Sequence, residues 1–229
     1  MAIIPARGGS ERIPRKNIRP FLGVPILARV VGTALESGQF SEVIVSTDDE
    51  EIAMVARSAG ASVPFTRSAE LADSHTGIAV VVEDALNRIG FAGDPDSVCV
   101  LFATAVLLTA RDISESIATF DRLEHFDHLM GVCRHPAPIE RAWRRTIDGG
   151  AEMVDPAHRL TRSQDLAPAF YDVGQIYVSR PSAWTEIVKG LQPRTYLYEL
   201  PSWRVADIDD ESDWERAEQM ARVLDAERT

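Results

Sequence analysis

Residues 2–17 read AIIPARGGSERIPRKN, a short apolar run followed by a glycine-rich and arginine-rich loop. The apolar run predicts a first strand, and ligands of open parallel sheets bind beyond the carboxyl ends of the strands. Gly8 and Gly9 leave the backbone bare enough for an oxygen-rich ligand to approach it closely. The loop matches neither the P-loop pattern GxxxxGK[ST] nor the dinucleotide pattern GxGxxG, so neither of those sites is predicted.

The same loop is the basic exception in an acidic chain. The whole chain has a formal charge of −11, whereas residues 7–19 hold five cations and one acid, a local charge of +4. The cations are Arg7, Arg12, Arg15, Lys16 and Arg19. This balance argues against nucleic acid or an anionic membrane as a partner and favours a small anion such as a triphosphate at this one place. A surface loop with turn glycines and solvated arginines explains the residue types equally well.

Composition indicates a single globular domain over residues 1–229. The chain is 45% hydrophobic and 26% charged, which is enough apolar material for a full core. Its apolar runs are too short for a membrane span, and no secretory signal pattern opens the chain. Cys99 and Cys133 lie far apart in apolar runs and are expected to be buried, reduced thiols. We therefore expect a cytoplasmic protein with no membrane partner.

Short β-branched runs alternate with helical stretches, which predicts a mostly parallel α/β sheet covered by helices on both faces. Strands are expected at residues 2–6, 42–49, 61–65, 97–103, 128–134, 173–179 and 195–200. Helices are expected at residues 25–37, 48–60, 76–89, from 110 onward and at 211–226. The alternation breaks at residues 134–170, which are rich in proline and arginine and are predicted to form an excursion or interface element.

Six motifs together resemble the CMP-sialic acid synthetase family. They are IIPARGGSERIPRKNI (3–18), VIVSTDDEEIA (43–53), PFTRSAELADSHTG (64–77), TRSQDL (161–166), DVGQIY (172–177) and DIDDESDWERAE (207–218). The segments PIERAW, TRSQDL and YDVGQIY are most similar to its pseudaminic acid branch. The resemblance implies a Rossmann-like nucleotide-diphospho-sugar transferase fold and a Mg²⁺-dependent transfer of CMP from CTP to the anomeric 2-hydroxyl of a nonulosonic acid. It also implies a homodimer in which the excursion reaches the active site of the partner.

The resemblance further assigns expected roles to individual residues. Nucleotide binding falls to Arg7, Gly8, Gly9, Ser10, Lys16, Asn17, Arg67 and Thr76. Catalysis falls to Arg7, Lys16, Asp207 and Asp209, and the two aspartates would also hold the Mg²⁺. Acceptor binding falls to Thr104, Arg162, Gln164, Asp172 and Gln175. Without the resemblance, the acidic run 207–213 is better explained as the solvated start of a helix, with Asp209, Asp210 and Glu211 as cap and first-turn acids.

The chain also departs from the family pattern. Glu11 stands where the family usually has lysine, a change expected to cost about 1–3 kcal/mol of triphosphate binding if the site is partly desolvated. The loop ATAVLLTA at 103–110 lacks the usual prolines, and Tyr171 stands where the pseudaminic branch commonly has histidine. Two alternatives therefore stay open: another acceptor acid, such as legionaminic or N-acetylneuraminic acid, and a catalytically weak CTP-binding protein that acts by interaction.

Two further features of the sequence have simpler interpretations. His125 and His128 could share a metal ion, but no third ligand is evident, so solvated or capping histidines are expected. The four tryptophans are scattered and are expected to serve packing or an interface. No side chain stands out as a general base.

Overall fold

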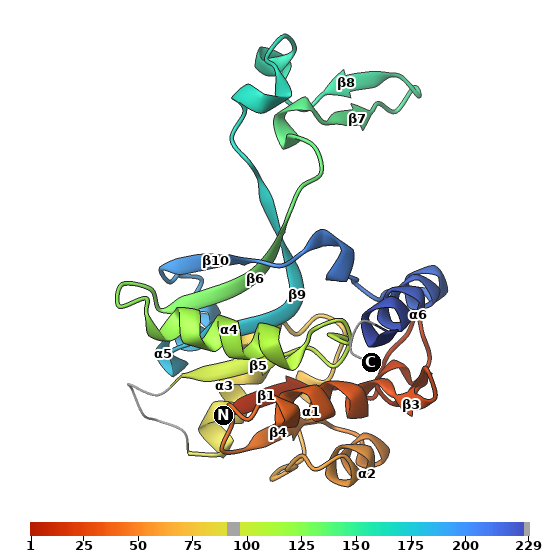
Figure 1. Cartoon of the computed structure of the whole chain (residues 1–229), viewed down its shortest axis with the longest axis vertical. Helices are drawn as coiled ribbons and strands as arrows, with labels where there is room; N and C mark the ends of the chain where they lie inside the picture. The colour runs from red at the N-terminus through yellow and green to blue at the C-terminus, as the bar shows by residue number, and fades with distance from the viewer. Residues whose placement is uncertain (91–96, 227–229) are drawn as a thin grey trace.

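A sheet of six strands forms the centre of the fold. The strands are β1 (Ala2–Pro5), β4 (Val43–Ser46), β5 (Val98–Leu101), β6 (His128–Arg134), β9 (Phe170–Ser179) and β10 (Thr195–Glu199). The computed structural model describes residues 1–90 and 97–226. In space the order is β10-β6-β9-β5-β1-β4, and within these described residues β9 is the one strand that runs against its neighbours (Figure 1).

Helices cover both faces of this sheet and bury a separate apolar layer on each (Figure 1). One face carries α1 (Ile26–Glu36), α2 (Glu50–Ser58), α4 (Ala110–Asp121) and α6 (Glu211–Ala226). The other face carries α3 (Ile78–Arg88) and α5 (Pro181–Val188). The predicted mostly parallel sheet with helices on both faces is therefore confirmed.

Local sequence explains where the helices nearest the carboxyl edge of the sheet begin. Asp49 caps α2 by accepting a hydrogen bond from the Ile52 amide at 3.0 Å. Thr109 and Asp112 form a reciprocal capping box at the start of α4. Gly60, with φ of 98°, follows α2 in the left-handed region that glycine tolerates best. These caps fix the loops that enter the helices, and those loops border the site.

The predicted strand at residues 61–65 is wrong. This segment makes only isolated parallel bridges to the edge strand, Ile44 with Ser62 and Thr47 with Thr66. Pro64 lies between the two bridges and has no amide hydrogen to donate, so a regular ladder cannot continue through it. A short hairpin not expected from the sequence, β2 (Pro20–Phe21) with β3 (Val24–Pro25), leads into α1 instead.

The segment between β6 and β9 leaves the sheet and projects as an arm (Figure 1). The arm lies within the range 134–170 where the sequence predicts an excursion, and it carries the hairpin of β7 (Trp143–Arg145) and β8 (Ala151–Met153). Trp143 is 61% exposed and Leu160 93% exposed, so large apolar side chains face solvent along the arm. No helix among the described residues has both the length and the apolar composition of a membrane span.

Candidate functional site

A cleft of 480 Å³ lies beyond the carboxyl ends of β1 and β5, where open parallel sheets bind their ligands. Seven of the residues predicted from the sequence line it: Arg7, Ser10, Lys16, Asn17, Arg67, Thr76 and Thr104. Glu11, Arg12 and Phe102 line it as well. The structure therefore brings the N-terminal basic loop together with residues from two later segments of the chain, 67–81 and 102–104.

The basic loop is held against the loop that follows β4. The Gly8 amide donates to Asp48 Oδ1 at 3.0 Å, and Arg15 Nη1 donates to Asp49 Oδ2 at 2.5 Å. A Cβ at position 8 would lie 2.8 Å from Asp49 Oδ2, so the close approach requires glycine there. The Arg15 hydrogen bond is also the main reason that the pKa of Asp49 is lowered. The basic loop is thus fixed to Asp49, the residue that caps α2.

Asn17 and Lys16 shape the inside of the loop. Asn17 is buried, and its Nδ2 donates to the Arg7 carbonyl oxygen at 2.9 Å. Lys16 Nζ donates to the Ile208 carbonyl oxygen at 2.6 Å and lies 3.9 Å from Asp209 Oδ1. Burial lowers the pKa of Lys16, while the charge of Asp209 acts in the opposite direction. Asn17 therefore fixes the backbone of the basic loop, and the half-buried Lys16 connects this loop to the segment that contains Ile208.

The two aspartates predicted to bind metal face the same way. Ile208 between them is fully buried, whereas Asp207 is exposed and Asp209 is partly exposed, which is the alternation of an extended segment. Burial raises the pKa of Asp207, the negative charge of Asp209 raises it further, and Lys16 lowers it. Arg12 Nη2 lies 2.7 Å from Asp209 Oδ1. Positive charge from two side chains is thus already gathered at these carboxylates.

This donor set fits a magnesium ion. No group of three or more metal-ligating side chains occurs in residues 1–90 and 97–226, so Asp207 and Asp209 would stand without a third protein carboxylate or imidazole. Mg²⁺ commonly binds to one or two carboxylates and takes its other oxygen ligands from water and substrate phosphates. The cleft beside the pair provides the room for such a substrate.

Arg67 forms the wall of the cleft and is anchored there. It is 4% exposed, its Nε donates to Ser46 Oγ at 3.2 Å, and its Nη2 donates to the Ser46 carbonyl oxygen. Burial lowers the pKa of Arg67, with the Asp48 charge acting against that effect. Thr76 lies near the mouth, where its amide donates to Asp73 Oδ1 at 2.6 Å. The segment that holds Arg67 and Thr76, both predicted to bind the nucleotide, therefore borders the cleft.

Two of the predicted acceptor residues lie on β9 near this edge of the sheet. Asp172 accepts from the Gly174 amide at 2.9 Å and from Tyr177 Oη at 2.6 Å. Gln175 is 2% exposed, and neither atom of its side-chain amide has a protein partner. Its carbonyl oxygen accepts from the amide of Phe102, which lines the cleft. A buried amide without partners is a group that a bound ligand or an ordered water would satisfy.

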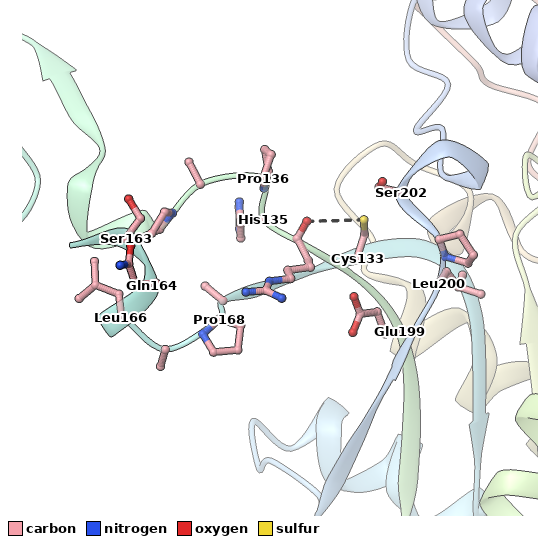
Figure 2. Close-up of a pocket in the computed structure, with 16 residues that line it drawn as sticks. Cys133, His135, Pro136, Ser163, Gln164, Leu166, Pro168, Glu199, Leu200 and Ser202 are labelled. Carbon is pink, nitrogen blue, oxygen red and sulfur yellow. Dashed lines mark hydrogen bonds between the residues drawn. The ribbon is translucent and has the colours of Figure 1, made fainter. Parts of the chain in front are cut away.

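Of the three remaining acceptor residues, Thr104 lines the cleft, whereas Arg162 and Gln164 lie on the arm, apart from the cleft of their own chain. Gln164 lines a second cavity, of 860 Å³, between the arm and the end of β10 (Figure 2). His135, Pro168 and Glu199 line this cavity too. Arg162 is exposed and donates to both carboxylate oxygens of Asp165, at 2.7 and 3.0 Å. Within one chain, the predicted site is therefore assembled only in part.

Two side-chain contacts of the site could not be predicted from the sequence, one within β9 and one between the two ends of the chain. The sequence indicates Arg12 only as part of the local positive charge and Tyr177 only as part of the DVGQIY motif. Hydrogen bonds from Tyr177 to Asp172 and from Arg12 to Asp209 depend on strand register and chain reversal, which no local pattern reports. The quoted motifs contained both residues, but nothing in them indicated these partners.

The remaining side chains singled out from the sequence have structural surroundings. His128 is buried against Tyr177 and Trp184, whereas His125 is exposed, so the expectation of two solvated or capping histidines is wrong for His128. Cys99 and Cys133 are buried and free, as predicted, and burial raises the pKa of Cys99 to about 12.

Comparison with known sequences extends this picture to the whole chain. A family model described as cytidylyltransferase matches residues 1–185. The chain is 38% identical to a pseudaminic acid cytidylyltransferase of Campylobacter jejuni, over 97% of this chain and 96% of that protein. It is 29% identical to the CMP-N,N'-diacetyllegionaminic acid synthase of Legionella pneumophila, over 97% and 96%. It is 32% identical to N-acylneuraminate cytidylyltransferase A of Danio rerio, over 97% of this chain and 50% of that protein.

Comparison with solved structures supports the fold. A CMP:2-keto-3-deoxy-manno-octonic acid synthetase complexed with CTP superposes with a TM-score of 0.70 at 18% identity, over 100% of this chain and 98% of that one. A 4-diphosphocytidyl-2C-methyl-D-erythritol synthase from Anaerococcus prevotii superposes with a TM-score of 0.64 at 11% identity, over 96% and 97%. At these identities the likeness shows the fold alone, which is the nucleotide-diphospho-sugar transferase fold expected from the sequence.

Proposed function

Because this chain belongs to the cytidylyltransferase family, we propose that it transfers CMP from CTP to the anomeric 2-hydroxyl of a nonulosonic acid, with pseudaminic acid as the favoured acceptor. The observation that carries the proposal is that Lys16, which lines the cleft together with Arg7, lies 3.9 Å from Asp209 Oδ1. A cation from the glycine-rich loop and a carboxylate from the far end of the chain are what a metal-dependent phosphoryl site needs.

The chain's own groups act mainly by positioning and by neutralising charge. Arg7, Lys16 and the loop amides bind the phosphate oxygens of CTP, and Asp207 and Asp209 would hold Mg²⁺, which supplies further positive charge at those oxygens. The acceptor oxygen attacks the α-phosphorus, the bond from that phosphorus to the bridging oxygen of the β-phosphate breaks, and pyrophosphate leaves with the electron pair. The hydroxyl proton passes to solvent. Lys16, half-buried beside the cleft, offsets the charge that develops on the leaving group.

The arm suggests that two chains complete one site. Arg162 and Gln164 lie on the arm and do not line the Lys16 cleft of their own chain, although both belong to the motif expected to contact the acceptor. Trp143 and Leu160 are large apolar side chains left exposed on the same arm. We therefore propose a homodimer in which the arm of one chain brings Arg162 and Gln164 to the acceptor bound by its partner.

We also place the reaction in the cytoplasm, where CTP is made. The two cysteines, Cys99 and Cys133, are free and buried, which suits a reducing compartment.

The acceptor is the finer part of the proposal. Identity at 38% over nearly the whole length favours pseudaminic acid, whereas relatives named for legionaminic and N-acylneuraminic acids are 29% and 32% identical. Tyr171, which is exposed at the start of β9, departs from the pseudaminic pattern and keeps a related acid as the second candidate.

The test is pyrophosphate release with Mg²⁺, offering each of the four nucleoside triphosphates against pseudaminic, legionaminic and N-acetylneuraminic acids. We expect release with CTP and pseudaminic acid and little with the other eleven pairs. Release with CTP and another of the acids would change the acceptor and keep the reaction. Binding of CTP without release from any pair would favour a catalytically weak nucleotide-binding protein.

A further inference from the structure

Arg12 and Asp209 are 197 positions apart in the sequence, and an ion pair joins them beside the cleft that Arg12 lines. Arg12 Nη2 donates to Asp209 Oδ1 at 2.7 Å, and the Arg12 side chain is otherwise 68% exposed. Lys16 approaches the same Asp209 oxygen, at the longer distance of 3.9 Å. A guanidinium group therefore occupies one of the two carboxylates that would hold the divalent ion.

Glu11, the residue before Arg12, places a negative charge beside this contact. Glu11 also lines the cleft and is exposed, and within the described residues no ion pair to Glu11 is formed. An uncompensated acid at the mouth of a triphosphate site lowers the affinity for a polyanion. Arg12, one position further, lines the same cleft and can offset that charge.

We propose that Arg12 exchanges partners: it neutralises Asp209 in the empty cleft and, when nucleotide and divalent ion enter, releases Asp209 to the metal and binds the triphosphate. In the second state Arg12 supplies the positive charge that Glu11 removes. This inference rests on the proposed function in taking CTP as the nucleotide and Asp209 as a ligand of the divalent ion.

Two features make exchange more reasonable than a fixed ion pair. An exposed arginine–carboxylate pair contributes little to stability, so it opens at small cost. A triphosphate carries several negative charges against one on Asp209, so it attracts the guanidinium more strongly and offers bidentate acceptors. Ile13, which is 1% exposed, anchors the backbone next to Arg12, so the base of the side chain stays beside the cleft in both states.

The first experiment measures metal binding without nucleotide. Mn²⁺ is titrated into wild-type protein and Arg12→Ala, and free Mn²⁺ is followed by electron paramagnetic resonance. We expect Arg12→Ala to bind Mn²⁺ roughly 3- to 10-fold more tightly, because the cation that competes for Asp209 is gone. Unchanged or weaker Mn²⁺ binding by the variant would overturn the exchange.

The second experiment measures CTP binding by calorimetry at a fixed, saturating Mg²⁺ concentration. Arg12→Ala should weaken CTP binding about 10-fold, and Arg12→Lys should recover part of the loss. The double variant Glu11→Lys/Arg12→Ala should bind CTP nearly as well as wild type, since it restores a cation at the mouth. A double variant as weak as Arg12→Ala would show that Arg12 does not compensate for Glu11.

Arg111→Ala is the matched control, because Arg111 also makes an exposed ion pair, with Glu115 at 2.7 Å, on α4. It removes the same net charge and should leave both affinities within about 2-fold of wild type. A control that lost as much CTP affinity as Arg12→Ala would contradict a specific role for Arg12. If wild type bound Mn²⁺ but no CTP, the proposed function would fail. The Mn²⁺ titration would still decide whether Arg12 competes for Asp209.

Discussion

At the scale of single residues, the site depends on groups that hold other groups in place. Gly8 permits the contact with Asp49, Asn17 ties the loop to the Arg7 carbonyl, and Tyr177 holds Asp172. The sequence motifs contain all of these residues. What the motifs lack is the pairing, because even residues of one motif, such as Tyr177 and Asp172, meet only through the local course of the backbone.

Gly8 and Gly9 offer a test of the loop contact. A Cβ at position 8 would lie 2.8 Å from Asp49 Oδ2, whereas one at position 9 meets nothing within 4 Å. Gly8→Ala should therefore lower the free energy of unfolding by about 1–3 kcal/mol, as overpacking does, and Gly9→Ala should change it by about 0.5 kcal/mol or less. Denaturant unfolding of the ligand-free protein measures both. Equal effects of the two substitutions would count against the contact.

Tyr177→Phe tests whether the hydrogen bond from the Tyr177 hydroxyl to Asp172 contributes to acceptor binding. The variant keeps the ring and removes the 2.6 Å hydrogen bond, so the carboxylate loses one of two fixed donors. We expect the KM for the acceptor acid to rise about 10-fold, the equivalent of a hydrogen bond to a charged group, with the KM for CTP unchanged. In Asp172→Ala the same substitution should have no further effect on the acceptor KM. An equal rise in both KM values would point to general disturbance of the sheet.

At the scale of elements, periodicity and caps predicted most of the fold. β6 and α6 have the bounds expected from the sequence, and α2 starts after the acidic cap that the sequence shows. The prediction failed at residues 61–65, where Pro64 interrupts a short segment that makes only isolated bridges to its neighbour. The reversal of β9 was also not predicted, because direction depends on how the arm returns to the sheet.

β9 itself shows why the acceptor side was harder to predict than the nucleotide side. Its pairing with β6 shifts register between Met130 and Val132, so Asp172 pairs with Val132 while Tyr177 pairs with Met130. This irregularity brings Tyr177 to Asp172 across five positions of the chain. A strand pattern of period two cannot report such a bulge.

The packing of β6 on β9 and α5 carries a pH-dependent stability. His128 stacks on Tyr177 and meets Trp184 edge to face, and burial lowers the pKa of His128 from 6.5 to about 4, against the charge of Asp172. Between pH 6.5 and 4, His128 is protonated in the unfolded chain and stays neutral in the folded chain. The free energy of unfolding therefore falls as the pH falls. The loss at this residue should reach about 3 kcal/mol.

His128→Phe keeps an aromatic ring and removes the titration. Urea unfolding at pH 7, 6, 5 and 4 should show a shallower decline for the variant than for wild type, by about the 3 kcal/mol expected of the histidine. Parallel declines for the two proteins would show that His128 is not the group responsible.

At the scale of the whole molecule, the residues of the proposed site are divided between the sheet and the arm. Composition predicted an excursion at residues 134–170, but its projection from the sheet could only come from the structure (Figure 1). The division predicts complementation between defective chains. Lys16→Ala disables the cleft, and Arg162→Ala/Gln164→Ala disables the arm, so each homodimer should be nearly inactive.

Mixing the two variants under conditions that allow exchange should restore activity. Random pairing makes half of the dimers mixed, and each mixed dimer has one intact cleft facing one intact arm, so about a quarter of wild-type activity is expected. The measurement is pyrophosphate release before and after exchange. Activity that stays at the level of the separate variants, with mixed dimers shown to be present, would contradict a site shared between chains.

We propose that the Lys16 cleft directs attack on the α-phosphorus of CTP. The decisive measurement is phosphorus NMR of the wild-type protein with CTP, Mg²⁺ and pseudaminic acid. We expect loss of the three triphosphate signals with growth of pyrophosphate and of one new phosphodiester, in equal molar amounts. Appearance of CDP and inorganic phosphate, or of CMP without a phosphodiester, would contradict it.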